Sequence, residues 1–599
     1  MVYPLRMLKL LAPLLFLIGA VGVVVISDRP MPPADYTFAQ INDFFTLDPP
    51  RMSYEQDLRM AYAIYEGLVR WDNETFEIEP ALAKRWELSE DRRTYTFHLR
   101  EEARWSNGDP VTAHDIHYSW QRAILPDTAA DYAQLFFLID GAEDYFNWRG
   151  EQLSAYAALP ERERTEEAAR ALRAEADERY RETVGVRVID AHTLEVRLQR
   201  PTPYFLDLCA FGVFYPVHRP TVERWASVSG RSGRIEQRHD WTKPGKIVTN
   251  GPYEVTSWRF KRDFRIERNP YYWNPEMVRS DSVAVVFISN GNTAVLAYQT
   301  GSVDWVENVV VDYLPEMIAQ KERGERDDLH RIVQYGTYFW SFNCTPTLPD
   351  GRDNPFHDPR VRRAFAMSMN KNDIVNRVRR VGEPPATVFI PSGSIPGFDE
   401  SGSIRGVGYD PAGARRLLAE AGWTIDEGSR RLRNSRGESF PVVELLCSTG
   451  SYHENVAQAF QIMWEETIGV QSRIVPKETR VFRDDLKRQN YMMARGGWFG
   501  DYGDPTTFLL LHTTGDGNND RGFSDPHFDE LVRSAEEAPT PEDRMRLLEE
   551  AERYSMEVAL PVVPVFHYVR YYLYDPDRFS GISFHPRSVQ YLWKLENKP

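Results

Sequence analysis

Apolar and polar residues alternate along this chain with two different periods. Between residues 54 and 68, apolar side chains recur every three or four positions, which predicts an amphipathic helix. Residues 94–100 instead alternate one by one, with Tyr95, Phe97 and Leu99 on one face, which predicts a half-buried strand. Elements of both kinds follow one another over most of the length, so the pattern predicts an α/β fold.

The same analysis extends to the rest of the chain. Thr112, followed three residues later by Asp115, predicts the start of a helix with a capping box. Further strands are predicted at 36–40, 184–198, 251–268, 282–288 and 442–446, and further helices at 293–300, 361–378, 410–421, 452–466 and 541–558. Strands come in pairs as often as singly, which does not fit the regular order of a barrel.

The N-terminal segment has the composition of a targeting signal. Arg6 and Lys9 precede an apolar run over residues 10–26, and prolines follow between 30 and 33. No small-residue cleavage site and no lipid-accepting cysteine occur where they would be expected. We therefore interpret the segment as an uncleaved signal anchor, with a cleaved signal peptide as the alternative. The charges before the run place the remaining body outside the inner membrane, periplasmic or extracytoplasmic and tethered.

Length, charge and cysteines narrow the class of protein. A chain of 599 residues is too long to fold around a single hydrophobic core, so two or more domains are expected. The net charge of -16 argues against non-specific nucleic-acid binding. Cys209, Cys344 and Cys447 are far apart and form no metal knuckle, so we expect buried thiols, with a Cys209–Cys344 bridge as the alternative. No cofactor or metal is expected.

The most distinctive stretch is RGGWFGDYGDPTTF, residues 495–508. Its glycines let a backbone approach a ligand closely, and Trp498 and Tyr502 can supply apolar walls with a polar tip. Asp501 is a candidate partner for a cation and Arg495 for an anion. A zwitterion such as an amino acid or a peptide carries both charges. The alternative is a turn between core elements with two solvated carboxylates.

Several stretches together resemble one family, the extracellular solute-binding proteins of peptide ABC importers (family 5), and most of all its oligopeptide-binding branch. The matching blocks occur in order at 105–122, 241–253, 267–273, 358–368, 414–422 and 495–508. The resemblance implies a two-lobed periplasmic-binding-protein fold that closes by a hinge on an extended peptide. It also implies a monomer without catalytic activity, whose partners are a peptide and the permease subunits of an importer.

The resemblance further implies a division into three domains. Residues 1–33 would form the signal anchor and spacer. Domain I would comprise 34–65, 219–273 and 569–599, domain II would comprise 66–218 with a helical insertion at about 150–182, and domain III would comprise 274–568.

The resemblance implies ligand-binding roles for residues of this chain that match the family's binding positions. Asp501 matches the carboxylate that pairs with the peptide's α-amino group. Arg495 matches an arginine that can meet the carboxylate of a short peptide. His453 falls where oligopeptide binders carry a histidine for the C-terminus of longer peptides, although an exposed histidine at a helix start is the alternative.

Five further residues resemble cleft positions. Gly497 and Phe499 match residues whose backbone pairs with the ligand. Tyr132 resembles an aromatic residue over the peptide, and Asn250 and Tyr272 resemble other cleft residues. For these last three, core packing or a turn is the alternative.

Three departures from the family pattern leave the side-chain preference open. Residues 477–480 lack a tryptophan that commonly walls a side-chain pocket in oligopeptide binders. Phe499 replaces a cysteine found in some relatives. The charged segment 151–181 is additional and predicts one or two solvated helices.

Two other functions remain possible from the sequence. In one alternative, the same fold binds a sugar, a metal chelate or a signal peptide. A hydrolase could use Asp501 and Asp504 as an acid/base pair, but Pro505 makes a shared helical face improbable, and no nucleophile elbow or H-E-x-x-H motif occurs.

Overall fold

The structure, a computed structural model, describes residues 31–449 and 452–598. The expected signal anchor lies outside these residues apart from the end of its spacer. In the described part of the chain, no helix has both the length and the apolar character needed to cross a membrane.

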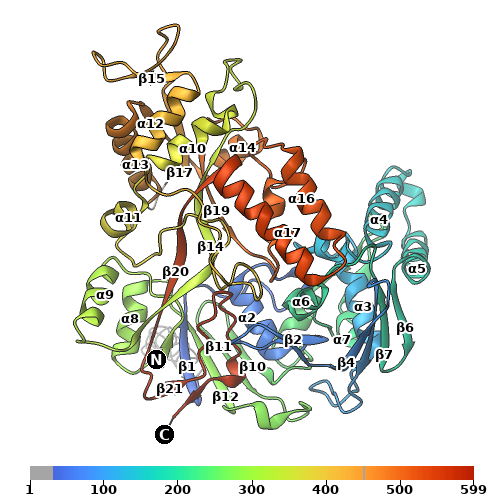
Figure 1. Ribbon diagram of the computed structural model, residues 1–599. Helices are drawn as coiled ribbons and strands as arrows, with labels where there is room; N and C mark the ends of the chain where they lie inside the picture. The colour runs from blue at the N-terminus through green and yellow to red at the C-terminus, as the bar shows by residue number, and fades with distance from the viewer. Residues whose placement is uncertain (1–30, 450–451, 599) are drawn as a thin grey trace, which may run out of the picture.

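A mixed sheet of ten strands links the lower and upper parts of the molecule as seen in Figure 1. Strand β1 is parallel to β12 and β13, whereas β14 is antiparallel to β19 and β20. In spatial order the strands are β10 (Tyr253–Arg259), β11 (Asp263–Arg268), β12 (Ser282–Phe287), β1 (Tyr36–Gln40), β13 (Trp305–Val306), β20 (Val562–Tyr574), β14 (Leu329–Phe342), β19 (Met493–Phe499), β17 (Val443–Ser448) and β18 (Ser472–Lys477).

Two large hydrophobic cores divide the molecule into two lobes. Lobe 1 is built on the core that contains Trp105 and Trp241, and lobe 2 on the core that contains Trp340 and Trp464. The long strands β14 and β20 contribute residues to both cores, so they connect the lobes. Their pairing shifts register between Val333 and Thr337, where the chain passes from one lobe to the other. The three-domain division stays a prediction.

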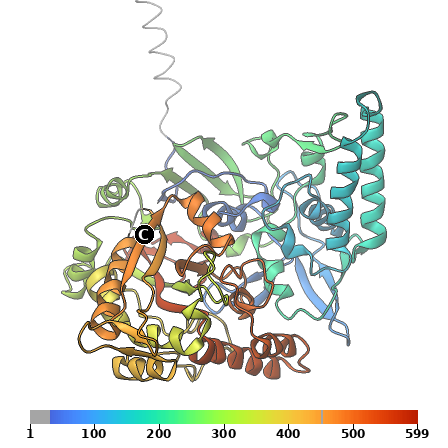
Figure 2. The same cartoon turned by 90° about the horizontal axis from the view of Figure 1, so that it is seen from above.

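Lobe 1 confirms the predicted local patterns. Strand β5 (Thr94–Leu99) has alternate residues buried, and helix α3 (Ala113–Ile124) begins with the capping box of Thr112 and Asp115. The other elements used below are α2 (Glu55–Ile64), α6 (Phe205–Ala210), β2 (Val69–Trp71) and the four-stranded sheet of β4 (Ala83–Leu88), β5, β7 (Thr193–Arg197) and β6 (Val186–Asp190). The charged insertion forms two helices, α4 (Ala142–Ala157) and α5 (Glu166–Thr183), which project from the side of lobe 1 (Figure 2).

Lobe 2 corrects one prediction. The prediction of a single helix over residues 361–378 was wrong. The chain forms α10 (Pro359–Met367), then a break, and then α11 (Lys371–Asp373), which continues into a π-helical turn over Ile374–Arg379. The Asn370 side chain accepts a hydrogen bond from the Asp373 amide at 3.3 Å and starts the second segment. This local cap outweighs the helical periodicity. The other helices of lobe 2 include α12 (Pro411–Glu420), α13 (His453–Ile468), α14 (Thr479–Lys487), α15 (Thr506–Leu509), α16 (Pro526–Glu536) and α17 (Pro541–Tyr554).

All three cysteines are buried free thiols, as expected from their spacing. The Cys209–Cys344 alternative is therefore not realised in this structure.

Candidate functional site

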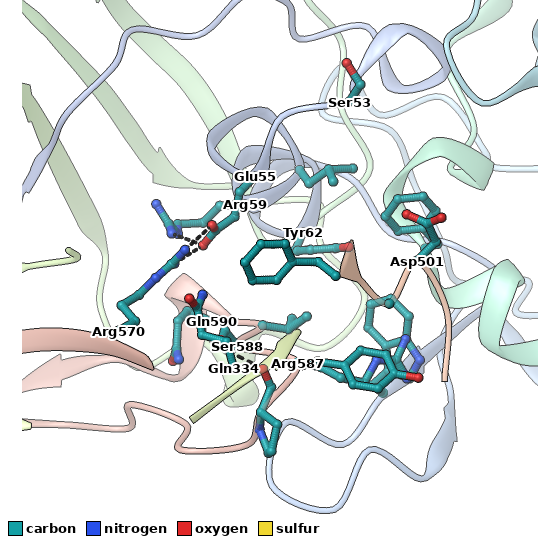
Figure 3. Close-up of a pocket in the computed structure, with 18 of the residues that line it drawn as sticks. Ser53, Glu55, Arg59, Tyr62, Gln334, Asp501, Arg570, Arg587, Ser588 and Gln590 are labelled. Carbon is teal, nitrogen blue, oxygen red and sulfur yellow. Dashed lines mark hydrogen bonds and ion pairs between the residues drawn. The ribbon is translucent and has the colours of Figure 1, made fainter. Parts of the chain in front are cut away.

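A cavity of about 450 Å³ lies where the end of β19 meets α2, β14 and the C-terminal segment (Figure 3). Both lobes contribute to its wall. Most of that wall is apolar or aromatic, and its residues include Leu58, Tyr62, Tyr132, Phe211, Phe499 and Val589. Concave sites of this size and composition, with a few polar groups, are typical of small-ligand binding.

Asp501 supplies a carboxylate on one side of this cavity (Figure 3). It follows β19 directly, and its backbone N–H donates to the Thr507 hydroxyl at 3.0 Å. Among the residues that the structure describes, no ion pair or hydrogen bond engages the carboxylate itself. Burial raises the pKa of Asp501 to about 6. The side chain is therefore a half-buried acid placed to receive a cation.

Contacts with both lobes hold the turn that carries Asp501. Tyr502 packs in the lobe 1 core and stacks on Tyr204, with ring centroids 4.6 Å apart and planes 15° apart. The Tyr335 hydroxyl donates to the Tyr502 carbonyl at 3.0 Å. Residue 500 has to be glycine for this packing, because a Cβ atom there would lie 2.0 Å from the Tyr335 ring. The carboxylate thus sits at the junction of the two lobes.

Asp207 ties this turn to the rest of lobe 1. Its carboxylate accepts hydrogen bonds from the Gly503 amide at 2.9 Å, from the Trp71 indole at 2.8 Å and from both terminal nitrogens of Arg587 at 2.6 and 2.7 Å. Sequence reasoning missed Asp207, although an acid within the apolar stretch 205–211 was a signal for a buried polar role. We infer that Asp207 positions the turn without touching a ligand.

The Asp207→Asn variant is expected to unfold more easily, by about 2 kcal/mol, because it weakens several charge-assisted hydrogen bonds. It also leaves the Arg587 guanidinium unpaired in the cavity wall, where it repels a cationic ligand group. Calorimetric titration and urea unfolding measure both effects. The double variant Asp207→Asn/Arg587→Gln removes that repulsion, so it should recover affinity relative to the single variant. Unchanged affinity in the single variant would contradict the positioning role.

Charged residues also lie on the side of the cavity opposite Asp501, but they are paired with one another (Figure 3). Arg570 forms a bidentate pair with Glu55. Arg59 lies 3.0 Å from Glu55 and 3.0 Å from Glu307. Burial acts to raise the pKa of Glu55, but the charges of Arg570 and Arg59 outweigh it and lower the pKa to about 2. This side of the cavity is polar and has no net charge.

The edge of strand β19 is open beside the cavity. On one side of β19, all of its residues pair with β14. On its other side, β17 pairs only with Met493 and Ala494 among the described residues. The backbone from Arg495 to Phe499 therefore presents unpaired groups to that side, and an extended chain can add there as a strand.

Phe499 and Tyr568 form an aromatic pair next to this edge. Their ring centroids lie 4.7 Å apart with planes at 17°, and Phe499 keeps 49% of its surface exposed. Glycines make room for the pair. A Cβ atom at Gly336 would lie 2.4 Å from the Phe499 ring, and one at Gly497 would lie 2.4 Å from the Tyr568 hydroxyl.

The structure brings only some of the predicted site residues to the cavity. Asp501, Phe499 and Tyr132 line it. Trp498 packs against the lobe 2 core, while Gly497 lies on the open edge and Tyr502 is buried in the turn. The residues that sequence reasoning missed are Asp207, Arg587, Glu55, Arg59 and Arg570.

Asn250 and Tyr272 lie away from the cavity, in the interior of lobe 1. The Asn250 side chain accepts from the Glu66 amide at 3.1 Å and donates to the Glu66 carbonyl at 3.0 Å. The Tyr272 hydroxyl donates to the Glu66 carboxylate at 2.7 Å. These bonds match the core-packing alternative for both residues.

Arg495 and His453 lie together in lobe 2. Arg495 donates to the His453 imidazole at 2.7 Å, and burial together with the charges of Arg495 and Arg379 lowers the pKa of His453 to about 4. The imidazole is therefore neutral at pH 7. No carboxylate pairs with Arg495 in the part of the chain that the structure describes, so its charge is available to an anion.

A second cavity of about 670 Å³ adjoins the first and shares Gln334 and Arg570 with it. Arg379 in its wall donates to Glu383 at 2.8 and 2.9 Å and lies 3.2 Å from the centre of the Tyr452 ring. The two cavities together give the space between the lobes an elongated form.

Asp504 does not share the environment of Asp501. Its carboxylate accepts two hydrogen bonds from Arg544, at 2.7 and 2.8 Å, and both side chains are buried. The hydrolase hypothesis therefore lacks its second free carboxylate. No group of three or more His, Cys, Asp or Glu side chains that could hold a metal ion occurs in residues 31–449 and 452–598.

Binding of a cationic group at Asp501 is expected to depend on pH. Below about pH 6 the carboxylate takes up a proton before a cation can pair with it, so affinity should fall about tenfold for each further pH unit. For an α-amino ligand, affinity should also fall above about pH 8, where the amine loses its charge. Dissociation constants measured from pH 4.5 to 9 check this. A flat profile below pH 6 would contradict the role of Asp501.

Comparison with known proteins gives one consistent picture. Residues 77–520 match the family model described as bacterial extracellular solute-binding proteins, family 5 Middle. The oligopeptide-binding protein OppA of Bacillus subtilis is 29% identical over 523 residues, which are 86% of this chain and 84% of that protein. The α/β fold and the family resemblance seen in the sequence are thereby confirmed.

Solved structures share the two-lobed fold. The murein tripeptide-binding protein MppA in its unliganded open form has a TM-score of 0.74 at 26% identity, over 95% of this chain and 98% of that one. OppA of Haemophilus influenzae in complex with the peptide RPPGFSPFR has a TM-score of 0.65 at 26% identity, over 95% and 100% of the two chains.

Proposed function

Because the chain belongs to the bacterial extracellular solute-binding proteins of family 5, we propose that it is the substrate-binding protein of an ABC importer and captures oligopeptides between its lobes. The observation that carries this proposal is the carboxylate of Asp501, which has no partner among the described residues and lies in a cavity with several aromatic side chains, next to the open edge of β19. A peptide offers an ammonium group and a backbone that match these two features.

The bound peptide would lie extended along β19. Its ammonium group would pair with Asp501, and its first peptide groups would bond to the backbone of residues 495–499. Such main-chain bonds give affinity regardless of the ligand's sequence. The rest of the peptide would run towards the second cavity, in which water can adapt to different side chains.

Arg495 and His453 would act at the other terminus. The guanidinium of Arg495 is not paired with an acid in the described residues and projects from the same strand as the open edge. We propose that it receives the carboxylate of short peptides, and that His453 lies close to the C-terminus of longer ones. Arg495→Gln should therefore weaken the binding of a free-acid tripeptide but not of its C-terminal amide.

Titration of the purified protein with peptides tests the proposed function. The protein is first unfolded, dialysed and refolded, because retained peptide would mask binding. Isothermal titration calorimetry with tri- and pentapeptides should then show saturable binding, and a disaccharide of similar size should give none. Absence of binding by every peptide, or equal binding of the sugar, would overturn the proposal.

The partners and the location belong to the same proposal. We expect the protein to be a monomer outside the cytoplasm, tethered by its N-terminal segment, and to deliver its ligand to permease subunits of an importer. Membrane fractionation of cells that express the full chain should place it with the inner membrane, and removal of residues 1–33 should release it.

A further inference from the structure

We propose that the cavity beside Asp501 selects peptides whose first side chain is large, apolar and uncharged. This inference rests on the proposed function, because it requires a peptide whose ammonium group pairs with Asp501. It goes beyond that function because it assigns a side-chain preference to the cavity, whereas main-chain bonds alone would bind peptides regardless of their side chains.

The first step is the chemistry of the wall contributed by lobe 1. Leu58 and Tyr62 come from α2, whereas Tyr132 and Phe211 come from two other segments and pack edge to face, with centroids 5.4 Å apart. These four side chains give the lobe 1 wall of the cavity its apolar surface. Burial of a large apolar side chain against such a surface is favourable in proportion to the area removed from water.

The second step is the distribution of charge. The carboxylate of Asp501 is the one charged group of the wall that lacks a partner among the described residues. Arg587 is paired with Asp207. On the opposite side, Arg570 is paired with Glu55, and Arg59 with Glu55 and Glu307.

Among the described residues of the wall, a charged first side chain therefore meets no free group of opposite charge. A glutamate side chain would lie near the carboxylate of Asp501 without an available cation. A lysine side chain would require a second free anion, since Asp501 is taken by the ammonium group of the peptide. Leaving such a charge unpaired in a partly dehydrated cavity is unfavourable.

The third step is the position of the apolar surface relative to Asp501. Tyr132 and Asp501 line the same cavity, and burial, with the charges of Asp501 and Asp131, raises the pKa of Tyr132 to about 12. The side chain closest to the ammonium group is the first one of the peptide. It is therefore the first side chain, rather than a later one, that enters the space walled by Tyr132 and Phe211.

Later side chains meet different surroundings. The second cavity contains three asparagines (Asn290, Asn292 and Asn308) and the exposed acid Asp312. Apolar residues such as Val310 and Leu314 also line it, but most of its lining surface is polar, whereas most of that of the first cavity is apolar. Selection is therefore expected at the first position and much less downstream.

A panel of tripeptides tests the inference on the refolded, ligand-free protein. Phe-Ala-Ala should bind about ten- to a hundredfold more tightly than Ala-Ala-Ala. Glu-Ala-Ala and Lys-Ala-Ala should bind more weakly than Ala-Ala-Ala. The positional control Ala-Phe-Ala should bind about as well as Ala-Ala-Ala.

Two variants assign the preference to the cavity. Tyr132→Ala should reduce the ratio between Phe-Ala-Ala and Ala-Ala-Ala by about tenfold. Phe260→Ala is the matched control, because Phe260 is 73% exposed and lies outside the cavity, and it should leave the ratio unchanged. Circular dichroism confirms that both variants fold.

The outcomes separate this inference from the proposed function. If all the tripeptides bind with equal affinity, or if Ala-Phe-Ala binds as tightly as Phe-Ala-Ala, peptide binding stands and the inference is wrong. If no tripeptide binds, the proposed function fails and the inference fails with it. If the ratio is the same in Tyr132→Ala and in the unmodified protein, the preference does not come from this cavity.

Discussion

Asp501→Asn is expected to weaken peptide binding by about 2–5 kcal/mol, the range for removing one partner of a buried charge pair. The same change should make the ligand-free protein more stable. Burial raises the pKa of Asp501 to about 6 in the folded state, against an ordinary aspartate value of about 3.9 in the unfolded state. Above pH 6 the folded protein therefore holds an ionised carboxylate in an unfavourable place.

The sign of this stability effect follows from proton linkage. Because the folded pKa is the higher one, the contribution of Asp501 to stability is present below about pH 4 and is lost as the pH rises through about 6. Two pKa units correspond to roughly 3 kcal/mol, and partial exposure of the side chain lowers this to about 2 kcal/mol. Asparagine, which never ionises, avoids this loss.

Thermal unfolding and peptide titration, both at pH 7.5, measure the two effects together. Asp353→Asn is a suitable control, since it removes an exposed carboxylate outside the cavity and should change neither quantity. If Asp501→Asn is more stable but binds peptide more weakly, then Asp501 lowers the stability of the ligand-free protein and strengthens peptide binding. An Asp501→Asn protein with unchanged affinity would contradict the account.

Asp504→Asn is expected to have the opposite effect on stability. It breaks the bidentate pair with Arg544 and leaves a buried guanidinium without its counter-charge, which should lower the free energy of unfolding by about 3–5 kcal/mol. Urea denaturation followed by tryptophan fluorescence measures the change. The double variant Asp504→Asn/Arg544→Leu, without the stranded charge, should recover part of the loss.

If Asp504→Asn were as stable as the unmodified protein, the pair would not have the structural role assigned here. If the variant instead lost a hydrolytic activity, the hydrolase hypothesis would return. Asp501 and Asp504 lie only three residues apart, yet Asp501 faces the cavity and Asp504 is bonded to Arg544 of α17.

Local elements could be predicted from the sequence because their signals are local. The alternation over 94–99 and the capping box at Thr112 depend on neighbouring residues, and both were right. The helix over 361–378 was wrong because its apolar period continues through Ser368–Asn370, where the cap at Asn370 interrupts it. Periodicity describes which face is buried and does not show where a chain breaks.

The site could be predicted only in part, for a related reason. Asp501 was found because its glycine- and aromatic-rich surroundings are contiguous in the sequence. The ion pairs that hold the Asp501 turn and balance the charges of the cavity wall join residues far apart in the sequence. Asp207 and Arg587 are 380 positions apart, and Glu55 and Arg570 are 515 positions apart. No spacing rule connects such residues. The same holds for the room that Gly336 leaves for the Phe499 ring.

The most direct test compares one peptide with and without a free amino terminus. Ligand-free protein is titrated by calorimetry at pH 7.5 with Phe-Ala-Ala and with its N-acetylated form, which keeps the side chains and the backbone but lacks the ammonium group. Pairing with Asp501 predicts that acetylation weakens binding at least about thirtyfold, and that this difference disappears in Asp501→Asn. Equal affinity of the two peptides for the unmodified protein would contradict the central claim.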